Sequence, residues 1–349
     1  MSKPAKPSKP QSSQTVLRVT FPDQSIKSFQ IPPEYKLSDA CAFLIKEKLD
    51  FGAATSGQEF QLMSLSENGC EVLDQELTPT QVAEQTGRSN MYLRRFLFLR
   101  DAKKFNPSIA MSAFDSFMLA QLQMDYLNSR VIYPVKHTAT LSMLIMADRL
   151  GKFDSTAHAS VLSAGISDYL PAWADDIRDW SKKCVTGKDL TLIKEFANIN
   201  SQNYEELFKA EIVQQWQEFS KLYNAEEISQ KAKAKFFEFA MSPEFELCSQ
   251  IQAFRVRYSG KAEDMSGEVY IGFGPMGMHF FDREGLFTKY CYQLHAIEAV
   301  QLGKKQVIIK TDDELEHQLD TKDGAEIKAM VENYQDILMQ MGLEDAATI

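Results

Sequence analysis

The sequence is poor in the features that mark secreted and membrane-spanning proteins. Its 349 residues include only five cysteines, which are scattered, odd in number and without a CxxC pair. Such usage is typical of a reducing cytosol and not of a disulfide scaffold. No apolar run approaches the roughly 18 residues of a membrane span, and residues 1–14 have no apolar core for a secretory signal. We therefore expect a cytoplasmic protein.

Motifs of catalysis and of metal binding are also missing. The five histidines form neither HExxH nor an i, i+4 pair, and no Ser or Cys lies in a nucleophile elbow. Gly272, Gly274 and Gly277 spell G-x-G-x-x-G, but the residues that follow have the pattern of a strand where a dinucleotide site needs a helix. The glycines therefore predict a hairpin turn. We expect no enzymatic activity, no cofactor and no metal site.

Positive charge is in short supply. The chain holds 38 basic and 48 acidic residues, for a net charge of −10, which disfavours nucleic acid as a partner because that binding needs a concentrated basic face. Residues 245–349 alone carry 18 acidic and 10 basic residues, a net of −8. Basic clusters do occur elsewhere, and from them we take four weak candidates for contact with anionic lipid: Lys103, Lys104, Lys182 and Lys183.

What the sequence does contain is three successive patterns. Residues 15–105 read as two strands, a helix and further strands, the order of a ubiquitin-like β-grasp. Residues 106–243 have helical periodicity, with helices expected at 166–180, 190–197, 204–223 and 225–241 among others. Residues 244–342 read as strands followed by one helix. The ends, 1–14 and 343–349, are expected to be tails, the first a disordered segment rich in Pro and Lys. The prediction is a multi-domain α+β protein.

The third pattern is the most informative. Seven strand-like runs are each bounded by Gly or charged turn residues, and they lie at 251–258, 268–273, 278–282, 286–292, 297–302, 306–310 and 315–320. An amphipathic helix follows, with Asp323 and Glu326 spaced as a capping box and Gly342 as its stop. Many short strands closed by one C-terminal helix are typical of a pleckstrin-homology or phosphotyrosine-binding β-sandwich.

These three lobes in this order resemble a FERM domain over about residues 15–342. The local likenesses are 125–154 (DYLNSRVIYPVKHTATLSMLIMADRLGKFD), 161–173 (VLSAGISDYLPAW) and 323–342 (DGAEIKAMVENYQDILMQMG). The last is most similar to the talin head and myosin-tail type. In that type, a groove between the fifth strand and the C-terminal helix of the third lobe receives an extended peptide by strand addition.

The resemblance implies a set of partner-binding residues on the strand 297–302 and on the facing helix. They are Ile297, Glu298, Ala299, Val300, Gln301, Leu302, Met330, Tyr334 and Ile337. The sequence departs from the talin type here, because Ala299 and Val300 stand where a basic residue and a large aromatic are expected and Glu298 reverses a charge. The groove should therefore fit a different ligand.

The function implied by the resemblance is that of a non-enzymatic cytoskeletal adaptor used in cell adhesion. Such a module links the cytoplasmic tail of a membrane protein, or the membrane surface, to the actin cortex, and works peripherally at the plasma membrane. One alternative is a cargo-binding or targeting FERM fragment of a larger motor or signalling protein. Another is a module that docks on phosphoinositide lipids.

Overall fold

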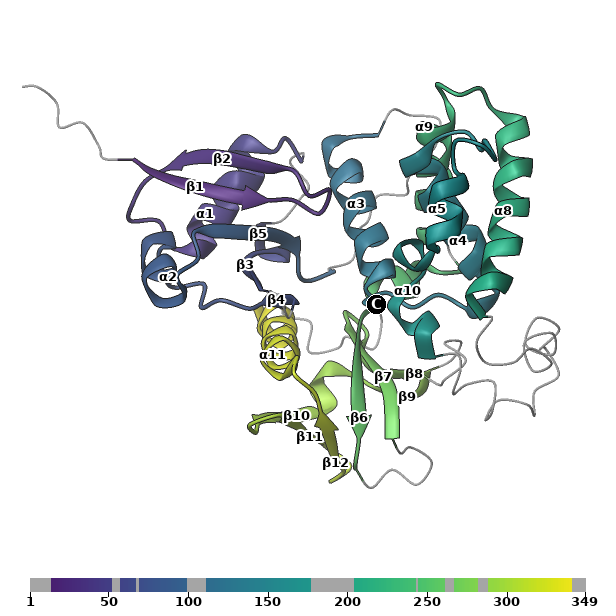
Figure 1. Ribbon diagram of the computed structural model, residues 1–349. Coiled ribbons are helices and arrows are strands. Elements are labelled where there is room, and N and C mark those ends of the chain that lie inside the picture. The colour runs from purple at the N-terminus through teal and green to yellow at the C-terminus, as the bar shows by residue number, and fades with distance from the viewer. Residues whose placement is uncertain are drawn as a thin grey trace, which may run out of the picture. The chain divides into compact units, whose positions relative to one another are not determined.

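The computed structural model describes residues 14–51, 57–66, 69–98, 111–176, 204–242, 244–260, 267–281 and 288–340. The predicted tails fall almost entirely outside these residues, as does the helix expected at 190–197. The chain divides into two compact units, residues 1–96 and 97–349 (Figure 1). The lobe boundaries predicted at 105/106 and 243/244 remain predictions.

The first unit is a five-stranded sheet with two helices. Its elements are β1 (Thr15–Thr20), β2 (Ile26–Ile31), α1 (Leu37–Phe43), β3 (Phe60–Ser66), β4 (Gly69–Glu71), α2 (Pro79–Thr86) and β5 (Asn90–Arg95), with a π-helical turn at Leu44–Lys48 and a 3-10 turn at Gly57–Glu59. The strand order is β2-β1-β5-β3-β4, and β1 runs parallel to β5. The sheet therefore has the β-grasp arrangement expected from the sequence.

Alternation along β1 explains the core of this unit. Leu17 and Val19 point to one face and are fully buried, while Val16 on the opposite face is 59% exposed. The helix α1 contacts β3 and buries Leu37 and Cys41. By residue type Ser38 would be expected to cap this helix, but α1 already begins at Leu37, with Lys36 as its N-cap.

The second unit begins with helices. They are α3 (Ala113–Leu127), α4 (Thr138–Leu150), α5 (Ala159–Ala164), α8 (Tyr204–Leu222), α9 (Ile228–Ala240) and α10 (Glu246–Gln250), with 3-10 turns at Val135–His137, Ser167–Tyr169 and Ala172–Asp176. Helix α4 packs against both α8 and α9, and the indole N–H of Trp216 on α8 donates to the carbonyl of Gly151 (2.9 Å). The long helices predicted at 204–223 and 225–241 are confirmed.

The helix predicted at 166–180 is wrong over its described part. Two short 3-10 turns replace it, and Leu170 between them is extended, with φ −94° and ψ 149°. The cause is Pro171, which disfavours the α conformation of the preceding residue and has no N–H to donate. Apolar periodicity alone does not reveal this break.

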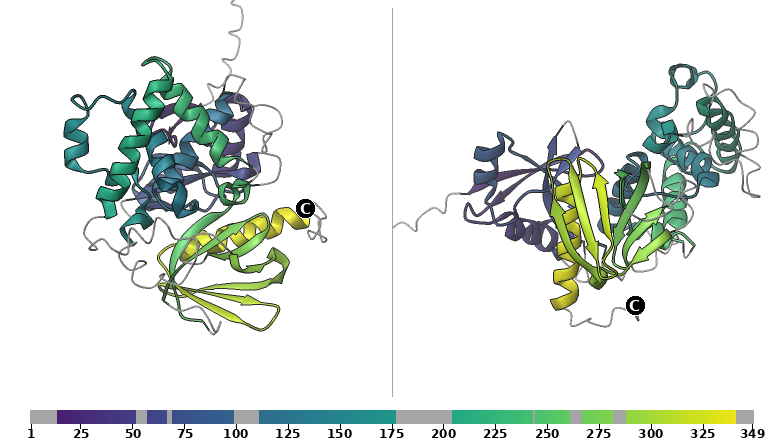
Figure 2. Two further views of the ribbon diagram at one scale, coloured as in Figure 1. Left: turned by 90° about the vertical axis from the view of Figure 1, so that its right-hand side faces the viewer. Right: turned by 90° about the horizontal axis from the view of Figure 1, so that it is seen from below.

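A seven-stranded sheet and one long helix complete the second unit (Figure 2). They are β6 (Gln252–Tyr258), β7 (Gly267–Gly274), β8 (Gly277–Phe281), β9 (Thr288–Tyr292), β10 (Ile297–Leu302), β11 (Gln306–Thr311), β12 (Glu316–Asp320) and α11 (Gly324–Gln340), with a 3-10 turn at Leu294–Ala296. The strand order is β10-β11-β12-β6-β7-β8-β9, and neighbouring strands pair antiparallel throughout the described residues. The strands match the predicted runs to within about two residues at each end.

The glycine-rich motif forms the predicted hairpin between β7 and β8. Gly274 pairs with Gly277 across a two-residue turn. Gly277 has φ +122°, and a Cβ there would overlap the carbonyl oxygen of Tyr292 on β9. The predicted hairpin turn is therefore confirmed, and the positive φ and missing Cβ of Gly277 also allow β9 to approach closely.

Candidate functional site

Strand β10 lies at one end of the seven-stranded order and leaves an edge of backbone available for pairing. The N–H of Gly303 donates to the carbonyl of Gln306 (2.7 Å). Because hydrogen-bonded and non-hydrogen-bonded pairs alternate along an antiparallel ladder, Val300 and Leu302 turn their N–H and C=O groups away from β11. An added strand would find its hydrogen-bond partners at these two residues.

The side chains of the same two residues form an open apolar strip. Val300 pairs with Ile309, and Leu302 pairs with Val307, so each shares a face with a fully buried neighbour. Yet Val300 is only half-buried, and Leu302 is 49% exposed. A bulge at Glu298 shifts the register and lets Ile297, which is buried, face the same side. The strip lies beside α11, which contacts β10 (Figure 1).

Two contacts hold α11 against this strand. The Gln335 side-chain amide donates to the carbonyls of Leu294 and Ile297, both at 2.9 Å. At the other end of the helix, a Cβ on Gly324 would lie 2.8 Å from Val307 and 3.4 Å from Leu302. A larger residue than glycine at position 324 would push the helix away from the strip.

The three predicted helix residues lie in the interior of the unit. Met330 and Tyr334 are fully buried, and Ile337 is 8% exposed. The Tyr334 hydroxyl accepts a hydrogen bond from the N–H of Phe98 (2.8 Å), which is also buried. Their contact with a ligand stays a prediction. In the structure they pack α11 against the interior of the unit.

Sequence reasoning missed three other residues of α11, which share one flank of the helix with the residue that contacts β10. Lys328, Gln335 and Leu338 are half-buried, and Gln335 marks the flank of the helix that faces β10. Their spacing of seven and three residues places them on one side of the apolar stripe. Helical spacing identifies the two flanks of the apolar stripe of α11, but it does not tell which flank faces β10.

The two ends of β10 differ in charge. Beyond Leu302, the tip of the β10–β11 turn presents Lys304 and Lys305, both exposed. Beside Ile297, Glu298 is exposed, and so are Asp312 and Glu314 of the β11–β12 turn. This turn is held next to the start of β10, because the N–H of Asp312 donates to the carbonyl of Ala296 (2.9 Å).

Asp313 strengthens the negative end. Burial works to raise the pKa of its carboxyl group, but hydrogen bonds outweigh that effect and bring the pKa below its ordinary value. The donors are the hydroxyl of Thr311 (2.6 Å), the N–H of Leu315 (3.2 Å) and the hydroxyl of Tyr292 (3.3 Å). The carboxylate is therefore charged at neutral pH.

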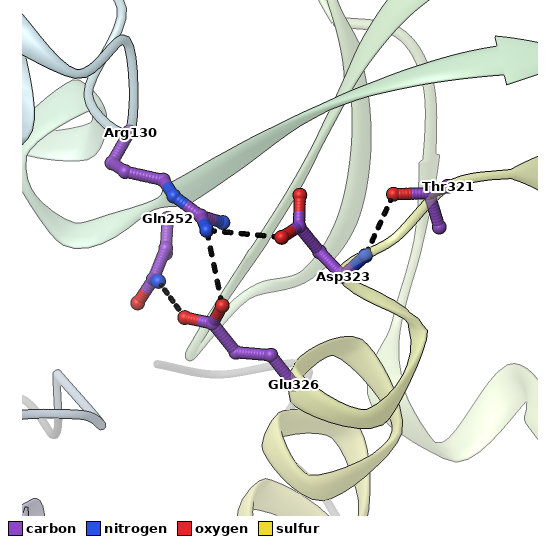
Figure 3. A network of polar contacts seen from close by, with 5 residues as sticks. All are labelled: Arg130, Gln252, Thr321, Asp323 and Glu326. Carbon is purple, nitrogen blue, oxygen red and sulfur yellow. Dashed lines mark hydrogen bonds and ion pairs between the residues drawn. The ribbon is translucent and has the colours of Figure 1, made fainter. Parts of the chain in front are cut away.

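A polar network fixes the N-terminus of α11 (Figure 3). The guanidinium of Arg130, in the turn that follows α3, binds Glu326 at 3.1 Å and Asp323 at 3.4 Å. Gln252 on β6 donates to the other oxygen of Glu326 (2.6 Å), and the N–H of Asp323 donates to the hydroxyl of Thr321 (3.1 Å). The predicted capping box is thus wrong, because Arg130 and Gln252 take the carboxylate that would have capped the helix.

Arg130 is tied to the sheet as well as to α11. Its carbonyl accepts the N–H of Ala253 on β6 (2.7 Å), and its guanidinium lies 4.6 Å from the ring centroid of Phe254. One residue of the helical segment therefore contacts both β6 and the helix that borders the β10 strip.

The remaining sequence predictions concern contact with lipid, metal binding and membrane spans. Lys103, Lys104, Lys182 and Lys183 all lie outside them. Within the described ranges, no group of three or more His, Cys, Asp or Glu side chains could hold a metal ion. None of the helices in this part of the chain combines the length and apolar character needed to cross a bilayer.

Comparison with solved structures identifies the fold. The human myosin 7b C-terminal MyTH4-FERM domain, in complex with the harmonin-a PDZ3 domain, is 13% identical, with a TM-score of 0.63 over 94% of this chain and 61% of that one. The Dictyostelium discoideum myosin VII MyTH4-FERM MF1 domain is 12% identical, with a TM-score of 0.63 over 93% and 60%. The complex of the FERM and C-terminal domains of Drosophila Merlin is 13% identical, with a TM-score of 0.51 over 96% and 99%.

The chain therefore has the FERM fold, and the three-lobe α+β architecture expected from the sequence is confirmed. It spans about three fifths of the length of the two myosin structures. No protein-family model matches the sequence, and no curated protein matches it. The talin-type likeness of the last helix remains a prediction.

Proposed function

We propose that this chain is a non-enzymatic, cytoskeleton-linked adaptor module that binds an extended peptide in the groove between β10 and α11. Its partner in this proposal is the cytoplasmic tail of a membrane protein, which the module links to the actin cortex at the plasma membrane. The observation that carries the proposal is the edge of β10. There Val300 and Leu302 offer both backbone groups and partly exposed apolar side chains beside a helix.

The groove suits an extended peptide better than a folded ligand. Backbone hydrogen bonds to a strand edge provide affinity, while the side chains that flank the edge provide selectivity. Here the partly exposed apolar side chains at the edge are those of Val300 and Leu302, and none of the six residues of β10 is aromatic. This supports a ligand that presents compact or β-branched apolar residues to the strip.

The test is a calorimetric titration of the full chain with membrane-tail peptides of the Asn-Pro-x-Tyr type. We expect binding that Val300→Asp weakens at least tenfold, because a carboxylate would be buried against the apolar ligand. The matched control is Val16→Asp, since Val16 is also a strand valine open to solvent, at 59% exposure, but lies in the first unit. If binding is absent, or if both variants reduce it equally, the groove between β10 and α11 is not the peptide-binding site.

A second candidate function is supported by the two myosin structures. Their FERM folds belong to motor-protein chains, one of them determined with a PDZ domain bound. By that analogy, this chain would bind cargo or a scaffold protein as part of a larger assembly. Capture of a folded PDZ domain by the full chain, unaffected by Val300→Asp, would favour this candidate over the first.

Docking on phosphoinositide lipids is the least supported of the three candidate functions. Residues 245–349 carry a net charge of −8, whereas attraction to an anionic surface grows by about 1 kcal/mol with each basic residue near it. The lysines proposed for this role lie outside the described residues. Co-sedimentation with phosphoinositide vesicles that falls steeply as salt is raised would support it.

A further inference from the structure

The β10 groove carries opposite charges at its two ends. At the Leu302 end, Lys304 and Lys305 are exposed. The acidic side chains near them are Asp320, which accepts a hydrogen bond from Gln306 (3.4 Å), and Asp323, whose charge is paired with Arg130 (3.4 Å). The Thr321 N–H donates to the Lys305 carbonyl (3.0 Å), so the β12–α11 connection lies beside the hairpin tip. This end has a positive balance.

The Ile297 end has a negative balance. Its four carboxylates are those of Glu298, Asp312, Asp313 and Glu314. The nearby Lys310 is engaged with Glu316 (2.9 Å) and so adds no free positive charge. Exposed His295 is the other basic group at this end.

The two ends are far enough apart to act separately. Six residues of extended strand span roughly 17 Å, whereas exposed charges are screened over about 8 Å at physiological ionic strength. A ligand lying along the strand therefore meets a positive field at one end and a negative field at the other. Between them it meets the apolar strip of Val300 and Leu302.

The direction of the ligand follows from the sheet. All neighbouring strands of this sheet pair antiparallel in the described residues, and parallel pairing is slightly less stable per residue. A strand added to β10 in the antiparallel sense has its N-terminal part at Leu302 and its C-terminal part at Ile297.

We propose that the groove selects tail peptides by their charge order. The preferred ligand has acidic residues on its N-terminal side, apolar β-branched residues in its centre and basic residues on its C-terminal side. This inference rests on the proposed function of the groove and adds the chemical class of the ligand. Its occupant is a segment of another protein, chosen by charge complementarity with the two ends of β10.

The test uses two fluorescein-labelled peptides of identical composition and opposite charge order. One runs from three acidic residues through Val-Thr-Val-Thr-Val to three basic residues, and the other has the charged ends exchanged. Fluorescence anisotropy with the full chain should give a Kd about tenfold lower for the first peptide, since several exposed ion pairs each contribute modestly. The difference should shrink at 0.5 M salt.

A charge reversal tests the assignment of the ends. The double variant Lys304→Glu and Lys305→Glu should lose most of the preference between the two peptides. Its control, Lys46→Glu with Lys48→Glu, makes the same change in net charge on exposed residues of the first unit. The control should keep the preference.

The outcomes separate the inference from the function beneath it. Binding of neither peptide overturns the groove itself and the inference with it. Equal binding of both, or preference for the exchanged order, overturns the charge selection and leaves the groove standing. Self-association of the chain that Val300→Asp abolishes, measured by analytical ultracentrifugation, would assign the edge to a second copy and overturn the peptide occupant.

Discussion

Replacing Arg130 with alanine is expected to destabilise residues 97–349 by about 3 kcal/mol. The change leaves Asp323 and Glu326 facing each other without a counter-charge. The Glu326 side chain is only 4% exposed, while those of Arg130 and Asp323 are 17% exposed. The cost should therefore approach the roughly 3–5 kcal/mol of a broken buried pair and exceed the less than about 1 kcal/mol of an exposed pair.

The assay is urea unfolding followed by tryptophan fluorescence. Trp173 and Trp216 are both buried in this unit, so the signal reports on its unfolding. In a unit of about 250 residues, a loss of about 3 kcal/mol corresponds to a fall in Tm of roughly 6–12 °C. Lys310→Ala is the matched control, because Lys310 belongs to an ion pair that is 40–45% exposed; it should cost less than about 1 kcal/mol.

A double-mutant cycle identifies the cause. In a Glu326→Gln background, the cost of Arg130→Ala should fall by at least about 1 kcal/mol, because one of the uncompensated carboxylates is gone. Peptide affinity should also fall in the Arg130→Ala single variant, since the N-terminus of α11 borders the β10 strip. If Arg130→Ala costs no more than Lys310→Ala, or the same in both backgrounds, the network does not hold the helix.

Two further stability predictions concern the β7–β8–β9 region. His279 is 3% exposed, and burial lowers its pKa from 6.5 to about 4. Between pH 7 and pH 5 the unfolded state therefore binds more protons than the folded state. The free energy of unfolding should fall by about 2 kcal/mol over this range. In urea titrations at both pH values, His279→Leu should lack that loss and the exposed-residue control His295→Gln should retain it. Gly277→Ala should destabilise by more than about 3 kcal/mol because its φ is positive and its Cβ overlaps Tyr292, whereas Gly303→Ala, which has room for a Cβ, should change the thermal midpoint little.

Local patterns in the sequence were sufficient to predict most elements. The alternation of Leu17 and Val19 places both in the core of the first unit, and the strand predicted at 297–302 is the observed β10. These patterns work because a strand repeats every two residues and a helix about every 3.6, whatever the element packs against. The order of the elements then led to the FERM fold.

Local patterns were less reliable where two neighbouring signals conflict. Apolar residues continue through 166–180, but Pro171 prevents the helix that they would otherwise favour. Asp323 and Glu326 have the spacing of a capping box, yet both carboxylates bind Arg130. In each case a specific steric or ionic interaction outweighs a preference worth only about 1 kcal/mol.

The sequence was enough to predict three lobes, a strand at 297–302 and an amphipathic last helix, because all of these depend on residues close together in the chain. The tertiary structure alone revealed that Arg130 meets Glu326 across 196 positions and that Gln335 marks the flank of α11 facing β10. It also revealed that Val300 and Leu302 stay partly exposed between opposite charges. Periodicity determines which residues share a face, but the path of the whole chain determines what that face contacts.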